Sequence, residues 1–327
     1  MPPFKTRLII IVLTLLVGIT LLVSHLGSTN HSAKNSELIY WSPPDTSAIP
    51  LNSEGELIRY GRELVTATSI YLGPKGKIEA ISNGMNCQNC HLNAGTKFWG
   101  NNYGAVAATY PKYRDRSGSL ETIAKRVNDC IERSLNGKAL DSNSREMKAF
   151  QAYLRWVGSN VPLKIKPIGS NIIDLVYDER GADSTKGREL YKLKCQSCHA
   201  IGGKGLLNKT GNAYIYPPLW GDNSYNTAAG LYRILKLAGF IKDNMPVGSS
   251  HDAPRLTDEE ALDVAAFINS QPRPLKNFTA DWPDISRKPI DYPFGPYTDS
   301  FSEFQHKFGP FGSIKQAHRI TSGAPKK

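Results

Sequence analysis

Two copies of one five-residue motif constrain this chain more than any other feature. They are Cys87-Gln88-Asn89-Cys90-His91 and Cys195-Gln196-Ser197-Cys198-His199. The pattern Cys-x-x-Cys-His is typical of c-type haem attachment, in which two thiols form thioethers with the haem and the histidine binds the iron. The sequence therefore predicts two covalently bound haem c groups. The residues that would hold them are Cys87, Cys90 and His91 for haem 1, and Cys195, Cys198 and His199 for haem 2.

The N-terminus predicts export from the cytoplasm. Lys5 and Arg7 precede an apolar run from Leu8 to Val23, which is typical of a signal peptide or a short membrane anchor. Extended to Leu26, the run would give roughly 28 Å of helix, barely enough to cross a bilayer. Two outcomes stay open, a cleaved signal or an inner-membrane tether through residues 8–26. Either one places the rest of the chain in the periplasm, where bacteria attach c-type haem.

Length and charge limit the class of protein. The 327 residues suffice for about two domains, and 40% of them are hydrophobic. The formal net charge is +11, from 40 basic and 29 acidic residues. A basic surface attracts anions broadly, but no Lys/Arg block is dense enough to favour nucleic acid. We therefore expect no nucleic-acid partner.

A loose internal repeat organises the chain. The sequence Gly-Arg-Glu-Leu precedes each haem motif, at Gly61–Leu64 and Gly187–Leu190. Each unit ends in an expected amphipathic helix, the first capped by Ser144 and the second by a Thr257–Glu260 capping box. Strand signals are scarce, so we expect an all-α fold with two class I cytochrome c-like haem domains.

The expected segments differ in composition. They are 1–26 (signal or anchor), 27–39 (polar tether), 40–165 (haem domain 1, active site), 166–181 (linker), 182–272 (haem domain 2, electron exit) and 273–327 (C-terminal arm). The arm is rich in proline and aromatic residues, a composition that disfavours long helices and is too aromatic for disorder. We expect an extended arm packed over the haem domains.

Met245 is the expected sixth ligand of haem 2. It precedes Pro246 and follows an expected helix over Ala228–Ile241, which is how class I cytochromes c place their distal methionine. Lys242 is an alternative ligand if it loses its proton. Three histidines outside the motifs and the tether are expected to be solvated or to surround the haems rather than to bind iron. They are His251, His306 and His318.

Haem 1 has no comparable methionine, but it has Cys130, the one cysteine outside the motifs. Cys130 lies on an expected helix over Leu120–Leu135, at the edge of its apolar face. Arg126 lies one turn before it and Ser134 one turn after, so the three share a stripe. A lone cysteine is ordinarily a small buried hydrophobe. The lack of another sixth ligand, and an arginine that favours thiolate, instead predict that Cys130 binds the haem 1 iron.

This combination suits an anionic sulfur substrate. Thiolate ligation lowers a haem's reduction potential and methionine raises it, so electrons would pass from haem 1 to haem 2. The guanidinium groups of Arg114, Arg116 and Arg126 suit sulfonate-like or phosphate-like oxygens. Sulfur–sulfur bonds form and break at thiolates, which gives Cys130 a chemical role.

At this point the residues match a family. The stretch Arg126–Gly137 resembles the dihaem c-type thiosulfate dehydrogenases, as do both haem motifs, the Asn244-Met245-Pro246 loop and the tail Lys288–Tyr297. The resemblance covers roughly residues 40–315. It implies that two thiosulfates are joined to one tetrathionate with release of two electrons, and some members run the reverse reaction.

The resemblance also implies residue roles. Cys130 would ligate haem 1, and Arg116, Arg126 and Ser134 would hold thiosulfate. Haem 2 would pass electrons to a small cytochrome c or a high-potential iron–sulfur protein. Some members carry a lysine directly before the methionine and exchange the two ligands with redox state. Here that position is Asn244, so we expect Met245 to bind in both states.

Three other interpretations compete. A dihaem electron-transfer cytochrome without its own substrate would leave Cys130 idle. A dihaem peroxidase needs an opening iron site with a distal acid or histidine, and no convincing candidate is found. A subunit of a sulfur-oxidising complex would use a Cys-ligated haem as a sulfur carrier, and tetrathionate formation by the isolated chain would distinguish it. The direction of the reaction depends on the haem potentials, which the sequence does not set.

Overall fold

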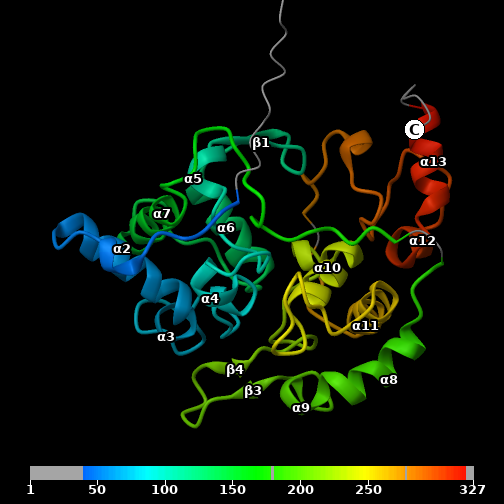
Figure 1. Ribbon diagram of the computed structural model, residues 1–327, viewed down its shortest axis with the longest axis horizontal. Coiled ribbons are helices and arrows are strands. Elements are labelled where there is room, and N and C mark those ends of the chain that lie inside the picture. The colour runs from blue at the N-terminus through cyan, green and yellow to red at the C-terminus, as the bar shows by residue number, and fades with distance from the viewer. Residues whose placement is uncertain (1–39, 178–179, 277, 322–327) are drawn as a thin grey trace, which may run out of the picture. The chain divides into compact units, whose positions relative to one another are not determined.

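Two packed helix pairs form the framework of the chain (Figure 1). The computed structural model describes residues 40–177, 180–276 and 278–321. Helix α2 (Ser53–Thr66) packs against α7 (Arg145–Val157), and α8 (Ser184–Lys194) packs against α11 (Asp258–Ser270). The other helices are α3 (Thr68–Leu72), α4 (Leu92–Gly95), α5 (Val106–Thr109), α6 (Ile123–Arg133), α9 (Gln196–His199), α10 (Ile234–Asn244), α12 (Glu303–Phe308) and α13 (Gly312–Thr321). Short 3-10 turns are η1 (Thr46–Ala48), η2 (Cys87–Asn89), η3 (Gly230–Tyr232) and η4 (Ile285–Arg287).

The repeated Gly-Arg-Glu-Leu sequence lies where the helices of each pair cross. A Cβ on Gly61 would lie 2.0 Å from the carbonyl oxygen of Ala149, and one on Gly187 would lie 1.9 Å from that of Asp263. Only glycine lets the two backbones approach this closely. The repeat therefore marks equivalent helix crossings in the two expected haem domains.

Both expected helix starts are confirmed. The hydroxyl oxygen of Ser144 accepts a hydrogen bond from the Met147 amide at 3.1 Å at the start of α7. At the start of α11, Thr257 and Glu260 form the reciprocal capping box. These caps satisfy amide groups that the first turn of a helix leaves without a backbone partner.

The hydrophobic side chains form two cores. The first is built mainly from residues between Trp41 and Val161, and the second from residues between Leu175 and Ile314. The first core also takes in a segment of the second half, including Tyr225 and Tyr232. Residues 40–327 accordingly form one compact unit.

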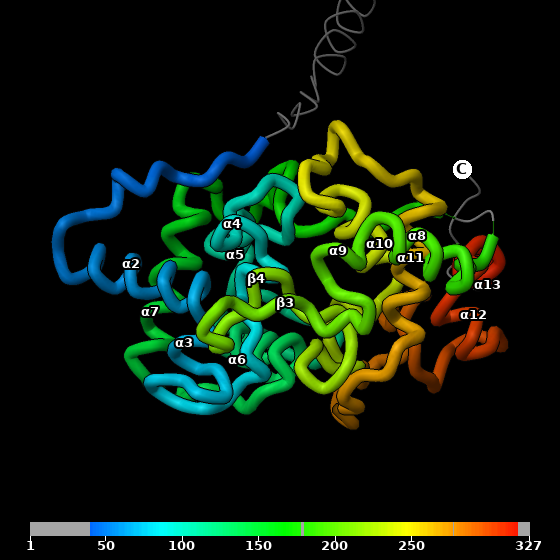
Figure 2. Tube along the Cα trace, turned by 90° about the horizontal axis from the view of Figure 1, so that it is seen from below, coloured from blue at the N-terminus to red at the C-terminus, as the bar shows by residue number. Residues whose placement is uncertain are grey.

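Two short antiparallel hairpins interrupt the helical fold. They are β1 (Lys112–Arg114) with β2 (Ser119–Glu121), and β3 (Leu206–Leu207) with β4 (Tyr214–Tyr216). Tyr214 of β4 packs against the first core, and Figure 2 shows this hairpin running beside the N-terminal half. The expectation of few strands holds, but the β1–β2 hairpin was not foreseen.

The helix expected over Leu120–Leu135 was wrong at its start. Leu120 lies in β2 opposite Tyr113 and is 66% exposed. Helix α6 begins only at Ile123, because Thr122 caps it by accepting a hydrogen bond from the Lys125 amide. Leu120 therefore belongs to the hairpin and not to the apolar face of the helix.

The helix expected over Ala228–Ile241 was also wrong in its limits. The segment divides into η3 (Gly230–Tyr232) and α10 (Ile234–Asn244). Arg233 between them has an extended backbone, with φ −76° and ψ 123°. Helix α10 continues to Asn244, so Met245 follows the helix directly.

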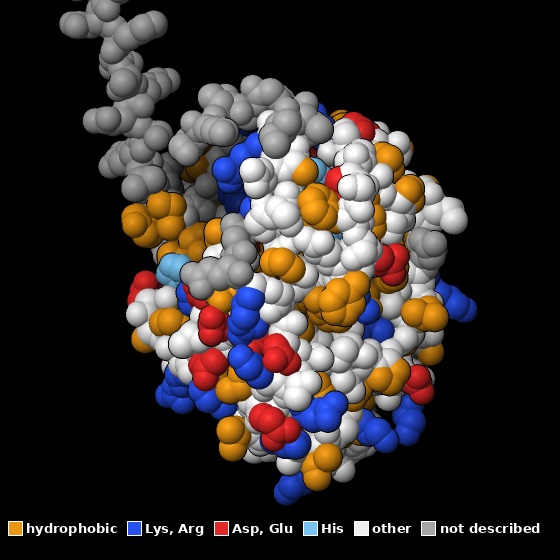
Figure 3. All heavy atoms as spheres, turned by 90° about the vertical axis from the view of Figure 1, so that its right-hand side faces the viewer, with side chains coloured by type: hydrophobic (Ala, Val, Ile, Leu, Met, Phe, Trp, Pro, Cys, Tyr) orange, Lys and Arg blue, Asp and Glu red, His pale blue; other side chains and the backbone are white. Residues whose placement is uncertain are grey.

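The C-terminal arm is only partly extended, because it includes α12 and α13. Most of its prolines precede α12, and Pro310 separates the two helices. Phe311 and Ile314 are 0% exposed and belong to the second core. On the face where α12 and α13 lie, basic and acidic side chains are interspersed (Figure 3).

The expected signal or anchor (1–26) and tether (27–39) lie outside the described residues. Among the helices that the structure describes, none has the length and apolar character needed to cross a membrane.

Candidate haem and anion-binding site

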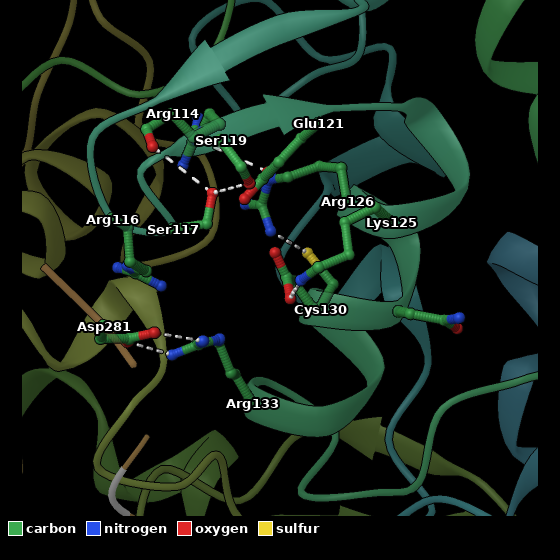
Figure 4. Close-up of polar contacts among 12 residues, drawn as sticks. Arg114, Arg116, Ser117, Ser119, Glu121, Lys125, Arg126, Cys130, Arg133 and Asp281 are labelled. Carbon is green, nitrogen blue, oxygen red and sulfur yellow. Dashed lines mark hydrogen bonds and ion pairs between the residues drawn. The ribbon is translucent and has the colours of Figure 1, made fainter. Parts of the chain in front are cut away.

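Cys130 lies on α6 with an arginine held against its sulfur. The Nη1 of Arg126 is 3.1 Å from the Cys130 Sγ, one helical turn away (Figure 4). Burial by itself would raise the pKa of this thiol, but the Arg126 charge and a hydrogen bond with His91 outweigh it and lower the pKa from 9.0 to about 7. Cys130 is thus a thiol that readily becomes thiolate at neutral pH.

One cavity brings the predicted residues of the first site together. Its volume is about 460 Å³, within the usual range for a cofactor pocket. The predicted residues that line it are Cys87, Cys90, His91, Arg116, Arg126, Cys130 and Ser134. Two thiols and an imidazole are the groups that attach and bind a haem c, and a further thiol on the same cavity could supply another iron ligand, so these residues fit the group.

His91 is oriented by the backbone. Its Nδ1 donates a hydrogen bond to the carbonyl oxygen of Asn101 at 2.5 Å, and its ring stacks on Tyr103 at 4.5 Å. This bond leaves Nε2 as the nitrogen that can bind a metal. The sequence motif identified His91 but could not indicate its carbonyl partner.

The second motif repeats this arrangement. The Nδ1 of His199 donates to the carbonyl oxygen of Pro217 at 2.9 Å. Burial lowers the pKa of His199 and so favours the neutral imidazole that binds metals. Met245 is half-buried and packs with Cys195 against the second core. These residues fit the expected haem 2 site.

Lys242, the alternative ligand, and the three described histidines outside the motifs all have carboxylate partners. Lys242 forms an ion pair with Asp258, and His251 Nδ1 lies 3.2 Å from an Asp243 carboxylate oxygen. The remaining two histidines share one carboxylate. His306 Nε2 lies 3.0 Å from one oxygen of Asp299, and His318 Nε2 lies 2.8 Å from the other.

One backbone segment, Trp99–Asn101, contacts the ligand loops of both motif regions. The carbonyl of Asn101 holds His91, and the carbonyl of Trp99 accepts a hydrogen bond from Asn244 Nδ2 at 3.2 Å. Asn244 is 2% exposed and directly precedes Met245. Trp99 and Asn101 have φ values of 53° and 58°, a strained conformation that persists only where the surroundings enforce it.

Five arginines line the same cavity. They are Arg114, Arg116, Arg126, Arg133 and Arg233. Burial, followed by the charges of Arg133 and Arg126, lowers the pKa of Arg116 to about 10. Within the described part of the chain, Arg116 forms no ion pair with a carboxylate. The cavity therefore concentrates positive charge.

Sequence reasoning missed the partner of Arg133. Both terminal nitrogens of Arg133 donate to Asp281, at 2.6 and 2.8 Å. Asp281 lies in the C-terminal arm, 148 residues further along the chain. No local pattern could have linked them, although Arg133 lies within the stretch that carried the resemblance.

Comparisons with known proteins identify a cytochrome c domain in each half of the chain. The family described as SoxA/TsdA, cytochrome c domain matches residues 77–163, and the family described as Cytochrome c matches residues 184–272. A thiosulfate dehydrogenase of Psychrobacter arcticus is 37% identical over 74% of this chain and 71% of its own length. One from Stutzerimonas stutzeri is 33% identical over 83% of this chain and 87% of its own.

A solved structure is also similar. It is the thiosulfate dehydrogenase TsdBA from Marichromatium purpuratum, with a TM-score of 0.68 and 31% sequence identity. The match covers 79% of this chain, which spans about half (54%) of the length of that one.

Proposed function

Since this chain belongs to the thiosulfate dehydrogenase family, we propose that it joins two thiosulfate ions into one tetrathionate. It carries two covalently bound haem c groups, which accept the two electrons that this reaction releases. Haem 1 would be held by Cys87, Cys90 and His91 with Cys130 as sixth ligand. Haem 2 would be held by Cys195, Cys198 and His199 with Met245.

The observation that carries this proposal is the 3.1 Å contact between Arg126 and Cys130 inside the first cavity. An arginine held against a thiol keeps it available as thiolate and offers its remaining donors to a sulfonate. Arg116 and Ser134 line the same cavity. A nucleophilic sulfur and an anion-binding group are thus adjacent, as coupling of two sulfur oxyanions requires.

The proposed reaction has two balanced steps. The Cys130 thiolate bonds to the outer sulfur of one thiosulfate, giving a cysteine S-thiosulfonate and releasing two electrons. The outer sulfur of a second thiosulfate then attacks the sulfur bonded to Cys130. Tetrathionate leaves and the Cys130 thiolate is restored, with no further electrons exchanged.

The two electrons would leave through the second haem domain to a small cytochrome c or a high-potential iron–sulfur protein. A periplasmic location suits c-type haem, and an N-terminal tether to the inner membrane belongs to the same proposal. Because both directions use one site, the chain could also reduce tetrathionate.

Replacement of Cys130 with glycine tests this function. We expect thiosulfate oxidation to fall by at least about a thousandfold, since the nucleophile is removed. The assay is thiosulfate-dependent reduction of an artificial acceptor, with tetrathionate measured as product. Haem content and the visible spectrum check that both haems are retained. An unchanged rate in a fully haem-loaded Cys130→Gly protein would exclude the mechanism.

A further inference from the structure

Arg133 has one donor that its ion pair does not use. Asp281 takes both terminal nitrogens, whereas Nε is buried and has no hydrogen-bond partner among the described residues. The Arg133 side chain is 6% exposed and lines the cavity that contains Cys130. Buried donors are almost always hydrogen-bonded, so a buried guanidinium nitrogen without a protein partner, on a residue that lines this cavity, is available to a bound acceptor.

Arg116 shows the same feature. Among the described residues its Nε is also buried without a hydrogen-bond partner, and its side chain donates one long hydrogen bond, from Nη1 to the Ala228 carbonyl oxygen at 3.5 Å. Its guanidinium carbon lies 5.7 Å from the centre of the Trp282 ring. In Figure 4, Arg116 lies above Asp281 and Arg133 lies beside it, while Arg126 points toward Cys130. Arg116 and Arg133 therefore form one group around Asp281, apart from the Arg126–Cys130 contact.

Coupling of two thiosulfates needs two anion sites. Each ion carries two negative charges, and the two must approach within bonding distance of sulfur to sulfur. Their repulsion in a partly buried cavity has to be offset by separate positive groups. Arg126 is already beside Cys130, so it can serve the first ion but not both.

We propose that Arg133 and Arg116 form a second anion subsite, which takes the sulfonate of the second thiosulfate while Arg126 and Ser134 hold the first. This inference rests on the proposed function. It extends that function by assigning Arg133 as a binding residue and by dividing the cavity between two substrate ions.

The C-terminal arm sets the geometry of this subsite. Asp281 fixes the Arg133 guanidinium through two hydrogen bonds. The neighbouring Trp282 amide donates to the Arg116 carbonyl oxygen at 2.6 Å. Asp281 also cancels one positive charge, which limits how tightly the subsite holds an anion. Asp281 is therefore a positioning residue that acts through Arg133.

Arg133→Gln tests the subsite in the haem-loaded protein by separating the two steps. A limiting amount of thiosulfate should still reduce the haems at close to the wild-type rate, because the first subsite is intact. Under turnover, the KM for thiosulfate should rise about tenfold to a hundredfold, as expected for loss of a charge-assisted contact. Mass spectrometry should show the Cys130 thiosulfonate accumulating, because its release needs the second ion.

Asp281→Asn should change the KM for thiosulfate in the opposite direction from Arg133→Gln. Asparagine keeps the shape and one acceptor but removes the negative charge, so the subsite becomes more positive. The KM for thiosulfate should fall severalfold, and tetrathionate release should slow. If the ion pair only fastens the arm, both substitutions would raise KM together. That result, or an unchanged KM in Arg133→Gln, would overturn the proposal.

Arg180 and Asp263 provide a matched control. They form a bidentate pair with both N–O distances at 2.8 Å, and neither lines the cavity. Arg180→Gln and Asp263→Asn should leave the KM for thiosulfate unchanged. The Cys130→Gly protein tests the proposed function separately from the second subsite. Full activity of that protein would reject the mechanism, whatever the result for Arg133→Gln.

Discussion

At the scale of single residues, the two motif regions hold the motif histidine in the same way and differ in the other ligand that each region could supply. Both histidines donate Nδ1 to a backbone carbonyl, which fixes the ring and its tautomer. The first region places a thiol beside an arginine, whereas the second places Met245 against an apolar core. This difference would set the two haem potentials apart.

Met245→Leu tests the haem 2 assignment. Leucine fills a similar volume but cannot bind iron, so the methionine–iron charge-transfer band should disappear. The haem 2 potential should become more negative, because methionine ligation raises it. Potentiometric titration with optical detection measures both effects.

Lys242→Gln is the control for this variant. Lys242 already forms an ion pair with Asp258, so its loss should leave the charge-transfer band and the potential unchanged. A spectrum that changes in Lys242→Gln but not in Met245→Leu would reverse the assignment.

At the scale of the helices, glycine determines how closely each pair packs. Gly187→Ala would place a methyl group 1.9 Å from the Asp263 carbonyl oxygen. Overpacking of this kind costs about 1–3 kcal/mol, against which the better helix propensity of alanine recovers less than about 1 kcal/mol. We expect a net loss of unfolding free energy, measured by guanidinium denaturation.

Gly202→Ala serves as the comparison. The nearest atom to a Cβ at Gly202 is 3.6 Å away, on the flexible Lys204 side chain. Its unfolding free energy should therefore stay within about 0.5 kcal/mol of wild type. Equal losses at both glycines would show that the close helix crossing at Gly187 does not set the cost.

Contacts between residues close in the sequence could be predicted, and contacts between residues far apart in the sequence could not. The caps at Ser144 and Thr257 were correct because a cap depends on residues three positions apart. The helix start at Leu120 was wrong because pairing with Tyr113 overrides the helical pattern. Cys130 and Arg126 could be placed together because they lie one turn apart. The Arg133–Asp281 pair could not, since only the folded arm brings it together.

At the scale of the whole chain, the C-terminal arm ties the parts of residues 40–327 together. Asp281 contacts Arg133 of the first half, and Asp291 contacts Arg233 of the second. Asp291 is 0% exposed, and it accepts hydrogen bonds from Arg233 Nε at 2.8 Å and from the Leu235 amide at 3.1 Å. The arm is therefore part of the folded structure and not an appendage.

Asp291→Ala should destabilise the protein strongly. It leaves Arg233 largely buried beside a weaker partner, Asp174, at 3.8 Å, and loss of one member of a buried pair costs about 3 kcal/mol. The exposed Asp222→Ala is the reference and should change stability by less than about 0.5 kcal/mol. Denaturant titration of both proteins measures the loss of unfolding free energy. A loss in Asp291→Ala no larger than in Asp222→Ala would contradict a structural role for the arm.

Exchange of haem domains between relatives would have to preserve the contacts of the Trp99–Asn101 segment. Two carbonyls of this segment support His91 in one domain and Asn244 in the other, and its own amides are held by Gly169 and Asn171. A chimaera joined within the linker would replace one side of these contacts and keep the other. We therefore expect the two haem domains, although each is recognisable alone, to be exchanged between relatives most readily as a single unit.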